Sequence, residues 1–198
     1  MIHIERIINR IFESNTFLIS CEGSNAVWLV DVGDTEKVID SLSFDSQVKG
    51  VFLTHTHFDH LYGINKLYEE FPNMVVYVAE SGVEGLYSAK QNLSKYHECP
   101  LEYKGTNVVK LYDGSLVEIY PEIALKAFAT PGHTPDSMSF LIEEYLFTGD
   151  AYIPQAPVVS KLPGGDKAMA YKSKQFLIGF SRGKVLFPGH GDVFRNIV

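Results

Sequence analysis

The stretch Thr54-His55-Thr56-His57-Phe58-Asp59-His60 places three imidazoles and a carboxylate within the six residues from His55 to His60. It follows the apolar run 51–53, and apolar residues recur at helical spacing after it, from Leu61 to Phe71. The stretch is therefore predicted to join a buried strand to a helix. Packing does not require such a cluster, so we interpret it as a chemical site rather than as a solvated histidine-rich turn.

The spacing within this stretch favours metal binding. Side chains two residues apart on an extended segment point to the same side, so His55 and His57 can direct ring nitrogens to one point. Asp59 and His60, past the strand end, would turn toward a second point nearby. Imidazole is the commonest ligand of borderline metal ions, and a carboxylate adds negative charge. The stretch predicts one wall of a metal site that holds one ion or two.

Three later apolar strands also run into a residue that can bind metal. The pairs of strand and residue are 127–129 with His133, 145–147 with Asp150, and 185–187 with His190. Five of the seven histidines lie at these four strand ends, and only His3 and His97 lie elsewhere. Taken singly, each of the three later residues could be a turn histidine or a helix cap. Taken with the first cluster, they predict the other walls of one site.

Proline and glycine precede two of these residues, in Pro131-Gly132-His133 and Pro188-Gly189-His190. Proline fixes a sharp turn and glycine lets backbone approach closely. Such turns can aim a side chain at a fixed point.

Composition excludes several classes of protein. Of the 198 residues 45% are hydrophobic and 21% are charged, which is ordinary for a soluble globular protein. We expect a cytoplasmic protein without a membrane partner, because no basic opening segment precedes an apolar one and no apolar run approaches the roughly 20 residues that span a bilayer. The formal charge of −7, without basic tracts, argues against nucleic acid as a partner. Cys21 and Cys99 share no motif and are interpreted as buried free thiols.

The order of the expected elements predicts a mixed α and β chain. Strands are expected at 2–8, 16–21, 26–30, 51–53, 74–78, 108–112, 116–120, 124–129, 138–142, 145–148 and 185–187. Helices are expected near 35–42, from about 60 to 71, at 80–90 and at 166–180. The first three strands are expected to be antiparallel, and Asp113-Gly114 predicts a hairpin. The same order of elements, several strands followed by mixed strand and helix, occurs twice along the chain. This is consistent with two packed sheets between outer helices in one domain, 1–198.

Residues that could contact a substrate are harder to identify. The segment 91–106 has no clear period and is expected to be irregular and to lie over the site, where Tyr96, His97 and Tyr103 are candidates; His97 could equally be a surface residue. We expect the pocket wall to be drawn from Phe58, Tyr62, Tyr96, Tyr152 and 155–166, although any of these aromatics could belong to the core.

The motif set resembles the metallo-β-lactamase-fold hydrolase superfamily. The resemblance rests on His55-Thr56-His57-Phe58-Asp59-His60, Pro131-Gly132-His133, Thr148-Gly149-Asp150 and Pro188-Gly189-His190-Gly191, and on the acid-ended strand at 30–34. It spans nearly the whole chain. It implies an α/β fold, a four-layer αββα sandwich with metals at one edge. Where relatives often have paired glycines after the cluster, this chain has only Gly63.

The resemblance also implies a ligand set. His55, His57 and His133 would bind one metal ion, and Asp59, His60 and His190 the second, while Asp150 would bridge the two. Asp59 and Asp150 are also the candidate catalytic residues, and they would place negative charge on the ions and so limit their Lewis acidity. Asp31 would orient the site without binding metal. The implied cofactors are two divalent ions, with zinc favoured and iron or manganese compatible with the same donors.

The lack of a cysteine ligand and the adjacent Asp59-His60 pair resemble the glyoxalase II and lactonase-like branch. Because the chain ends eight residues after His190, we expect no C-terminal glutathione-binding domain. The sequence thus predicts a binuclear hydrolase in which a metal-bridging hydroxide attacks a small-molecule thioester, ester or lactone. The alternatives are a mononuclear iron oxidoreductase like the persulfide dioxygenases, a nuclease, and a non-enzymatic binding module. The sequence leaves substrate identity and oligomeric state open.

Overall fold

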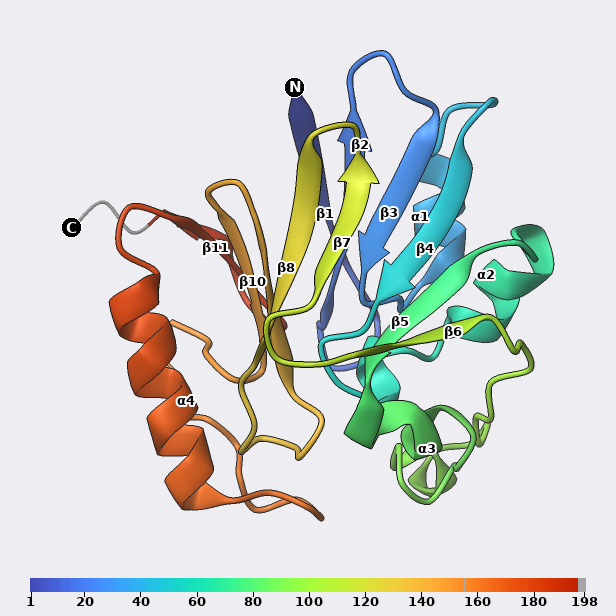
Figure 1. Ribbon diagram of the computed structural model, residues 1–198. Coiled ribbons are helices and arrows are strands. Elements are labelled where there is room, and N and C mark those ends of the chain that lie inside the picture. Colours follow the sequence, from blue (N-terminus) through green and yellow to red (C-terminus); the bar gives the residue numbers. More distant parts are fainter. Residues whose placement is uncertain (155, 196–198) are drawn as a thin grey trace.

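The computed structural model describes residues 1–154 and 156–195. Two six-stranded sheets pack face to face, and helices cover their outer faces (Figure 1). The first sheet has the strand order β1 (Ile2–Ile8), β2 (Asn15–Cys21), β3 (Ala26–Val30), β4 (Gln47–Phe52), β5 (Val75–Ala79) and β6 (Val108–Leu111). The second has the order β12 (Phe194–Arg195), β11 (Val185–Pro188), β10 (Tyr145–Gly149), β9 (Met138–Ile142), β8 (Ile123–Ala129) and β7 (Leu116–Tyr120).

Side-chain alternation along the strands divides the core into layers. On β2, Phe17 and Ile19 face the second sheet, whereas Leu18 faces the helices on the outer side. With the same alternation on β3, the side chains of Trp28 and Val30 lie between the two sheets. Successive strand residues point to opposite faces, so a strand buried on both faces is apolar throughout. This explains why β3, from Ala26 to Val30, is a continuous apolar run.

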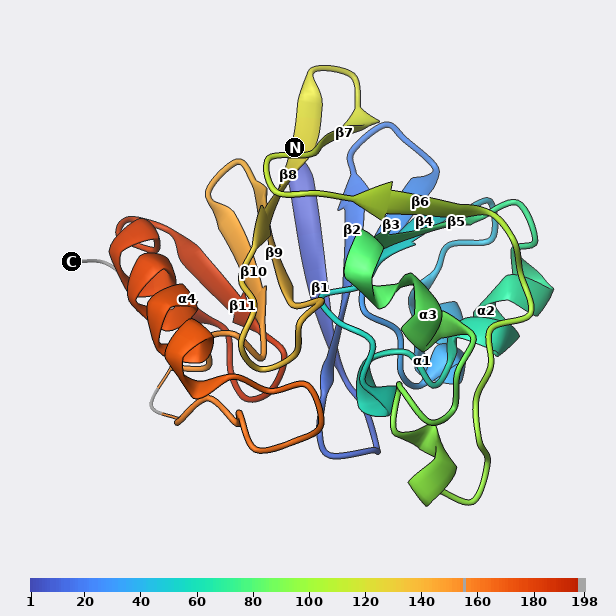
Figure 2. The same ribbon diagram turned by 60° about the horizontal axis from the view of Figure 1, so that its bottom comes forward.

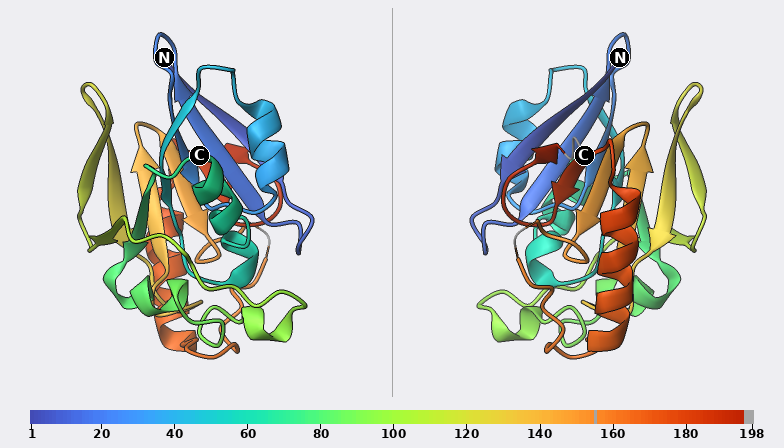
Figure 3. Two further views of the ribbon diagram at one scale, coloured as in Figure 1. Left: turned by 90° about the vertical axis from the view of Figure 1, so that its right-hand side faces the viewer. Right: turned by 90° about the vertical axis from the view of Figure 1, so that its left-hand side faces the viewer.

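The helices form the two outer layers. Helices α1 (Thr35–Ser41) and α2 (Ile64–Glu70) bury Val38, Ile64 and Leu67 against the first sheet. Helix α4 (Lys167–Phe180) buries Leu177 against the second sheet. The opposite side views in Figure 3 show these outer layers in turn. The predicted four-layer α/β sandwich is therefore confirmed.

Loops that follow four strands meet at one edge of the sandwich, which Figure 2 turns toward the viewer. β3, β4 and β5 run parallel, as do β10 and β11, so each group ends on one side of its sheet. The short 3-10 turn η1 (Phe58–His60) follows β4 at this edge. Helix α3 (Val83–Leu86) and the turns η2 (Glu80–Gly82) and η3 (Ser94–Tyr96) lie in the connection from β5 to β6.

The predicted hairpin at Asp113-Gly114 is wrong. The turn exists, with Gly114 at φ +82°, but its two arms enter different sheets. β6 pairs in parallel with β5, and β7 pairs antiparallel with β8. Both arms bury apolar side chains between the sheets, including Leu111 and Ile119, so the chain crosses the sandwich here.

Other predicted elements differ in extent. The helix expected at 80–90 shortens to η2 and α3, and the helix expected from His60 begins at Ile64 because η1 intervenes. β12 was not expected. Both cysteines are free, as predicted, but the prediction that both are buried is wrong, because Cys99 is exposed and Cys21 is only partly buried. Within the described part of the chain, no helix is long and apolar enough to cross a bilayer.

Candidate metal centre

The loop after β4 supplies four of the predicted metal ligands. His55, His57 and His60 are almost entirely buried at the end of the strand, and Asp59 lies within η1. Strand β4 pairs with β3 on one side and β5 on the other, so its buried carboxyl end is held in the middle of the sheet. We call these four residues, defined as His55, His57, Asp59 and His60, the first wall.

Three loops of the second sheet supply one residue each. His133 follows β8, Asp150 follows β10 directly, and His190 follows β11. We call these three residues the second wall. Gly189 allows the close approach, because a Cβ at this position would overlap Asp150 Oδ1. The sequence prediction that glycine permits such an approach is confirmed at this turn.

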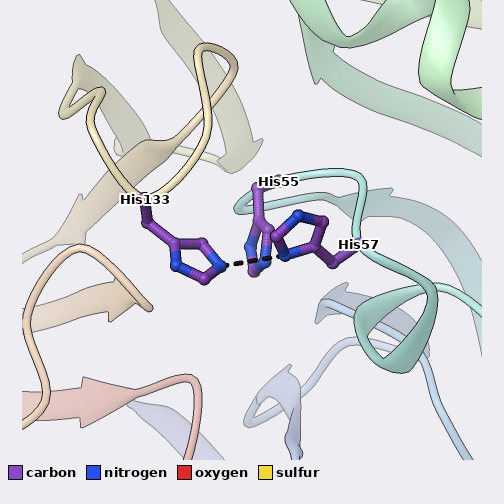
Figure 4. A group of neighbouring side chains, drawn as sticks. All are labelled: His55, His57 and His133. Carbon is purple, nitrogen blue, oxygen red and sulfur yellow. Dashed lines mark hydrogen bonds between the residues drawn. The ribbon is translucent and has the colours of Figure 1, made fainter. Parts of the chain in front are cut away.

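The two walls meet in two groups of side chains. The first group is His55, His57 and His133, which Figure 4 shows with their rings turned toward one another. His57 Nδ1 and His133 Nε2 are 2.9 Å apart. The ring of His55 lies 4.8 Å from each of the other two rings, centroid to centroid.

The second group is Asp59, His60 and His190. Asp59 Oδ2 lies 3.3 Å from His60 Nε2 and 3.2 Å from His190 Nε2, and these two nitrogens are 3.3 Å apart. The carboxylate of Asp150 stands between the groups. Its Oδ1 is 3.6 Å from His60 Nε2, and its Oδ2 is 3.6 Å from His133 Nε2.

All seven predicted ligands are therefore brought together in the pairing that the sequence resemblance implies. The structure shows that the side chains lie together, and their roles as metal ligands remain a prediction. His3 lies on β1, outside both groups.

Asp31 holds the first wall through side-chain hydrogen bonds. Its Oδ2 accepts from His60 Nδ1 at 2.8 Å and from the Thr54 hydroxyl at 2.8 Å, while Oδ1 accepts from the Thr54 backbone N–H. The Thr54 oxygen in turn lies 3.1 Å from His55 Nδ1. Asp31 thus orients two rings, and it does so from a left-handed backbone conformation with φ +58°. These contacts are those expected of a residue that orients the site.

Asp136 is a second anchor of the first wall, which the sequence analysis did not identify. Its Oδ2 accepts from the backbone N–H and the hydroxyl of Thr56, at 2.9 and 2.8 Å. Thr56 stands between His55 and His57, so this contact fixes the segment that carries both rings. The available signal was position, since Asp136 follows His133 in the same turn.

Backbone carbonyls, by contrast, hold the histidines of the second wall. His133 Nδ1 lies 2.6 Å from the carbonyl oxygen of Val159, and His190 Nδ1 lies 2.9 Å from that of Phe12. A carbonyl only accepts, so we assign the ring proton to Nδ1 in both histidines. In the neutral ring the inward Nε2 then carries a lone pair.

The donor set fits divalent metal ions. His55 Nε2 and Asp150 Oδ1 are buried in the centre, and neither has a hydrogen-bond partner. Buried polar atoms are normally paired, so two such atoms beside one cluster need a partner of another kind. Imidazole nitrogen and carboxylate oxygen are good ligands for zinc, iron and manganese. The cluster therefore has the composition and orientation of a metal-binding site.

The histidine pKa values differ between the two groups. Burial, with neighbouring imidazoles, lowers the pKa of His55 well below its usual value and that of His57 to about 4, so both are neutral near pH 7. Burial opposes charge on His190 as well, but Asp150 and Asp59 outweigh it and raise the pKa of His190 to about 9. The carboxylates of Asp59 and Asp150 thus stabilise positive charge in the second group.

A pocket of about 360 Å³ opens onto both walls. Its floor includes His57, Asp59, His133, Asp150 and His190. Of the predicted pocket residues, Phe58 and Tyr96 line it, as do Val159 and Leu162 from the segment 155–166; Gln155 lies outside the described residues. His97 also lines the pocket, with its ring 4.4 Å from that of Phe58.

Three other candidates lie elsewhere. The Tyr62 hydroxyl donates to Asp34, Tyr103 is buried in the core beneath the first sheet, and Tyr152 packs near Lys174. Phe12 and Leu93 line the pocket and were missed. Their approach depends on left-handed backbone, with φ +54° and +66°, which the sequence does not reveal for these residue types.

A family model described as the metallo-beta-lactamase superfamily matches residues 10–190. Among curated relatives, a hydroxyacylglutathione hydrolase of Pseudoalteromonas translucida is 29% identical over 146 residues, which are 73% of this chain and 49% of that protein. The chain thus spans about half the length of this relative. A probable metallo-hydrolase of Streptococcus pyogenes is 27% identical and is matched over 96% of this chain and 84% of its own length.

Among solved structures, that of the BLEG-1 B3 metallo-beta-lactamase has a TM-score of 0.88 with 23% sequence identity, covering 98% of this chain and 94% of that one. At this level of identity the likeness shows the fold.

Proposed function

The chain belongs to the metallo-beta-lactamase superfamily, and on that premise we propose that it is a binuclear metal-dependent hydrolase of a small-molecule thioester, ester or lactone. The observation that carries the proposal is that two groups of possible metal ligands meet beneath one open pocket, with His57 and His133 of the first group and Asp59 and His190 of the second lining it. A purely structural metal site would be closed to substrate, whereas a catalytic site keeps access to the ion.

The residues of the two groups suggest which ion each would hold. His55, His57 and His133 offer three inward ring nitrogens to one ion, and Asp59, His60 and His190 offer a carboxylate and two nitrogens to the other. Asp150 has an oxygen near each group and could bridge them. Zinc is favoured by the donor set, which also suits iron and manganese. Bound divalent ions would supply an activated water at neutral pH and polarise a substrate carbonyl.

The chain's own residues prepare this chemistry. Asp31 and Asp136 fix the rings of the first wall before substrate arrives, so little reorganisation is needed during the reaction. Asp59 and Asp150 are already ionised near pH 7: burial opposes their charge, but the interactions with His60, His190 and the other nearby histidines together outweigh it and lower the pKa of both carboxyls. They can therefore bind cations without first losing a proton.

The curated relatives support hydrolysis in general terms. One is named a hydroxyacylglutathione hydrolase and the other a probable metallo-hydrolase. The match to the first covers only part of that protein, so we extend to this chain the reaction type and not the glutathione moiety.

Hydrolysis of simple acyl substrates by the metal-loaded protein tests the proposal. The protein is stripped with a chelator, reloaded separately with zinc, manganese or iron, and assayed on a generic thioester, an ester and a lactone. We expect turnover that disappears on stripping and returns on reloading. A correctly loaded protein that is inactive on all three classes would contradict the proposal and favour a binding module.

The alternative of a mononuclear iron oxidoreductase makes a different prediction. It requires oxygen uptake with a persulfide substrate and only one iron per chain. The group Asp59, His60 and His190 argues against it, because these three side chains have no evident use if only the three-histidine group binds metal. Oxygen consumption with an iron-loaded protein, measured in parallel with hydrolysis, separates the two functions.

A further inference from the structure

Six largely apolar side chains surround the mouth of the pocket above the candidate metal centre. We call them the collar, defined as Phe12, Phe58, Leu93, Tyr96, Val159 and Leu162. They come from four separate segments of the chain: the β1–β2 connection, η1, the loop around η3, and the loop before α4. Their convergence on one opening is therefore a product of the fold rather than of local sequence.

Most of the collar is exposed although it is apolar. The exposed fraction is 67% for Phe12, 71% for Tyr96 and 51% for Val159. Contiguous exposed apolar surface at a cleft is a mark of a binding site, because it gains free energy only when something apolar covers it. Here the reactive groups lie at the floor of the same pocket.

The backbone at two collar positions is held in a conformation that their side chains disfavour. Phe12 and Leu93 have φ +54° and +66°, a left-handed region that suits glycine and is uncommon for bulky residues. Backbone outliers of this kind persist where surrounding structure enforces them, and they cluster at functional sites. The His97 ring braces the collar, since it lies 4.4 Å from the ring of Phe58 and 5.9 Å from that of Phe12.

The collar is also joined to the second wall. The carbonyl oxygens of Phe12 and Val159 are the atoms that hold the rings of His190 and His133. The residues whose side chains form the opening thus position two candidate ligands through their backbones. A group seated in the collar would lie over the floor at a fixed distance from those ligands.

The pocket that the collar lines differs in charged residues from a second pocket beside His57. Among the described residues that line the pocket, none is lysine or arginine. A second, polar pocket on another side of His57 contains Lys90, Ser88 and Gln91. An anionic group placed among the collar side chains would lose water, which is costly, and the lining offers it no lysine or arginine. Lys95 Nζ, next to the collar, already lies 4.7 Å from the centre of the Tyr96 ring, so pairing with an anion would cost that contact.

We propose that the collar binds the acyl chain of an uncharged substrate, so that the enzyme prefers thioesters or esters of apolar acids over those whose acyl chain ends in a carboxylate. This inference rests on the proposed hydrolytic function and adds the substrate class to it. The carbonyl of the scissile bond would lie at the floor, and the apolar chain would extend past Phe12, Tyr96 and Leu162.

A series of N-acetylcysteamine thioesters with acetyl, butyryl, hexanoyl and adipoyl groups tests the preference on the metal-loaded protein. We expect kcat/KM to rise about fourfold for each methylene that the collar buries. We expect the adipoyl thioester, whose six-carbon chain ends in a carboxylate, to be hydrolysed more than about tenfold less efficiently than the hexanoyl one. Equal rates on acetyl and hexanoyl substrates, or a preference for adipoyl, would overturn the inference.

Two matched variants assign the preference to the collar. Phe12→Gly removes the ring but accepts φ +54° without strain and keeps the carbonyl that holds His190. Glu13→Gly is the control, because Glu13 has φ +52°, is exposed and does not line the pocket. We expect Phe12→Gly to reduce the ratio of hexanoyl to acetyl kcat/KM by roughly tenfold, and Glu13→Gly to retain the wild-type ratio.

A third variant tests the charge argument by gain of function. Tyr96→Lys adds a cation at the exposed rim and should raise the ratio of adipoyl to hexanoyl turnover. An unchanged ratio would contradict the placement of the acyl chain at this rim.

Binding of unreactive amides separates this inference from the proposed function. If no thioester or ester is hydrolysed, the hydrolase assignment fails, but saturation-transfer NMR still compares acetamide, hexanamide and adipamate on the same protein. Stronger saturation of hexanamide, lost in Phe12→Gly and kept in Glu13→Gly, would support the collar as an acyl-binding site. Equal signals from acetamide and hexanamide, or stronger adipamate binding, would overturn it.

Discussion

The two walls of the candidate metal centre carry similar ligands but hold them differently. In the first wall, carboxylates anchor the site: Asp31 binds the ring of His60, and Asp136 binds Thr56. In the second wall, backbone carbonyls of Phe12 and Val159 hold the rings of His190 and His133. A side-chain anchor can be removed by substitution, whereas a carbonyl anchor remains when its side chain is changed. The walls should therefore differ in their response to mutation of the surrounding residues.

Removing a ligand should have the largest effect, and it should be the same in both walls. His57→Ala in the first wall and Asp150→Ala in the second each delete a donor at the floor of the pocket. We expect turnover below about a thousandth of the wild-type rate, while the protein remains folded. Steady-state assays with circular dichroism as the folding control measure this. Wild-type turnover in either variant would show that the ligand set is wrong.

Substitution of a carboxylate that anchors the first wall should have the second-largest effect. Asp31→Asn keeps the size of the side chain and tolerates φ +58°, but it replaces the charged acceptor of the His60 Nδ1 proton. Loss of such an outer partner typically lowers metal affinity or activity by about 10–100-fold. Competition with a chromogenic chelator measures the affinity. An unchanged affinity would show that the anchors of the first wall do not act on the metal site.

A third buried carboxylate, Asp34, sharpens this contrast because it contacts none of the predicted ligands. Burial opposes its charge, but hydrogen bonds from Tyr62, Lys37 and Arg10 outweigh burial and lower the pKa of Asp34 to about 2. A lowered pKa stabilises the fold above the ordinary value near 3.9, and this contribution is lost as the pH falls toward 2.

We therefore expect Asp34→Asn to reduce the free energy of unfolding by about 2 kcal/mol at pH 6, with the deficit shrinking as the pH falls from about 4 to about 2. Urea unfolding at several pH values measures it, with the exposed Asp45→Asn as the control. Metal affinity should stay at the wild-type level. A deficit that does not change with pH would indicate packing rather than charge as its cause.

The smallest effect is expected at the carbonyl anchors. Val159→Ala shortens a half-exposed side chain and leaves the carbonyl that accepts from His133 Nδ1. Metal affinity should change by less than about twofold, the opposite of the result at Asp31. The same chelator competition applies. A loss as large as that of Asp31→Asn would remove the distinction between the walls.

The contrast also shows what the sequence could predict. The candidate ligands could be picked out because histidine and aspartate follow apolar strands at four places, and the motif set predicted the four-layer sandwich. The role of Asp31 was likewise expected. These features depend on side-chain chemistry and on the local pattern of residues, both of which can be seen directly in the sequence.

The features that were missed depend on the backbone or on distant pairing. The carbonyls of Phe12 and Val159 have no signature, since every residue has a carbonyl. The turn at Asp113-Gly114 has the local chemistry of a hairpin, but the pairing of β6 with β5 sends its arms into different sheets. Asp136 was not recognised as an anchor because its partner, Thr56, lies 80 residues away along the chain.

Metal stoichiometry tests most directly whether the two walls together form a binuclear centre. Wild-type protein is stripped, reloaded with zinc, freed of excess metal and analysed by mass spectrometry for zinc per chain. If both groups of candidate ligands bind metal, the protein should hold about two zinc ions per chain, falling to about one in His190→Ala, which removes a candidate ligand from the second group alone. One ion per wild-type chain, with the same value in His190→Ala, would contradict the binuclear account.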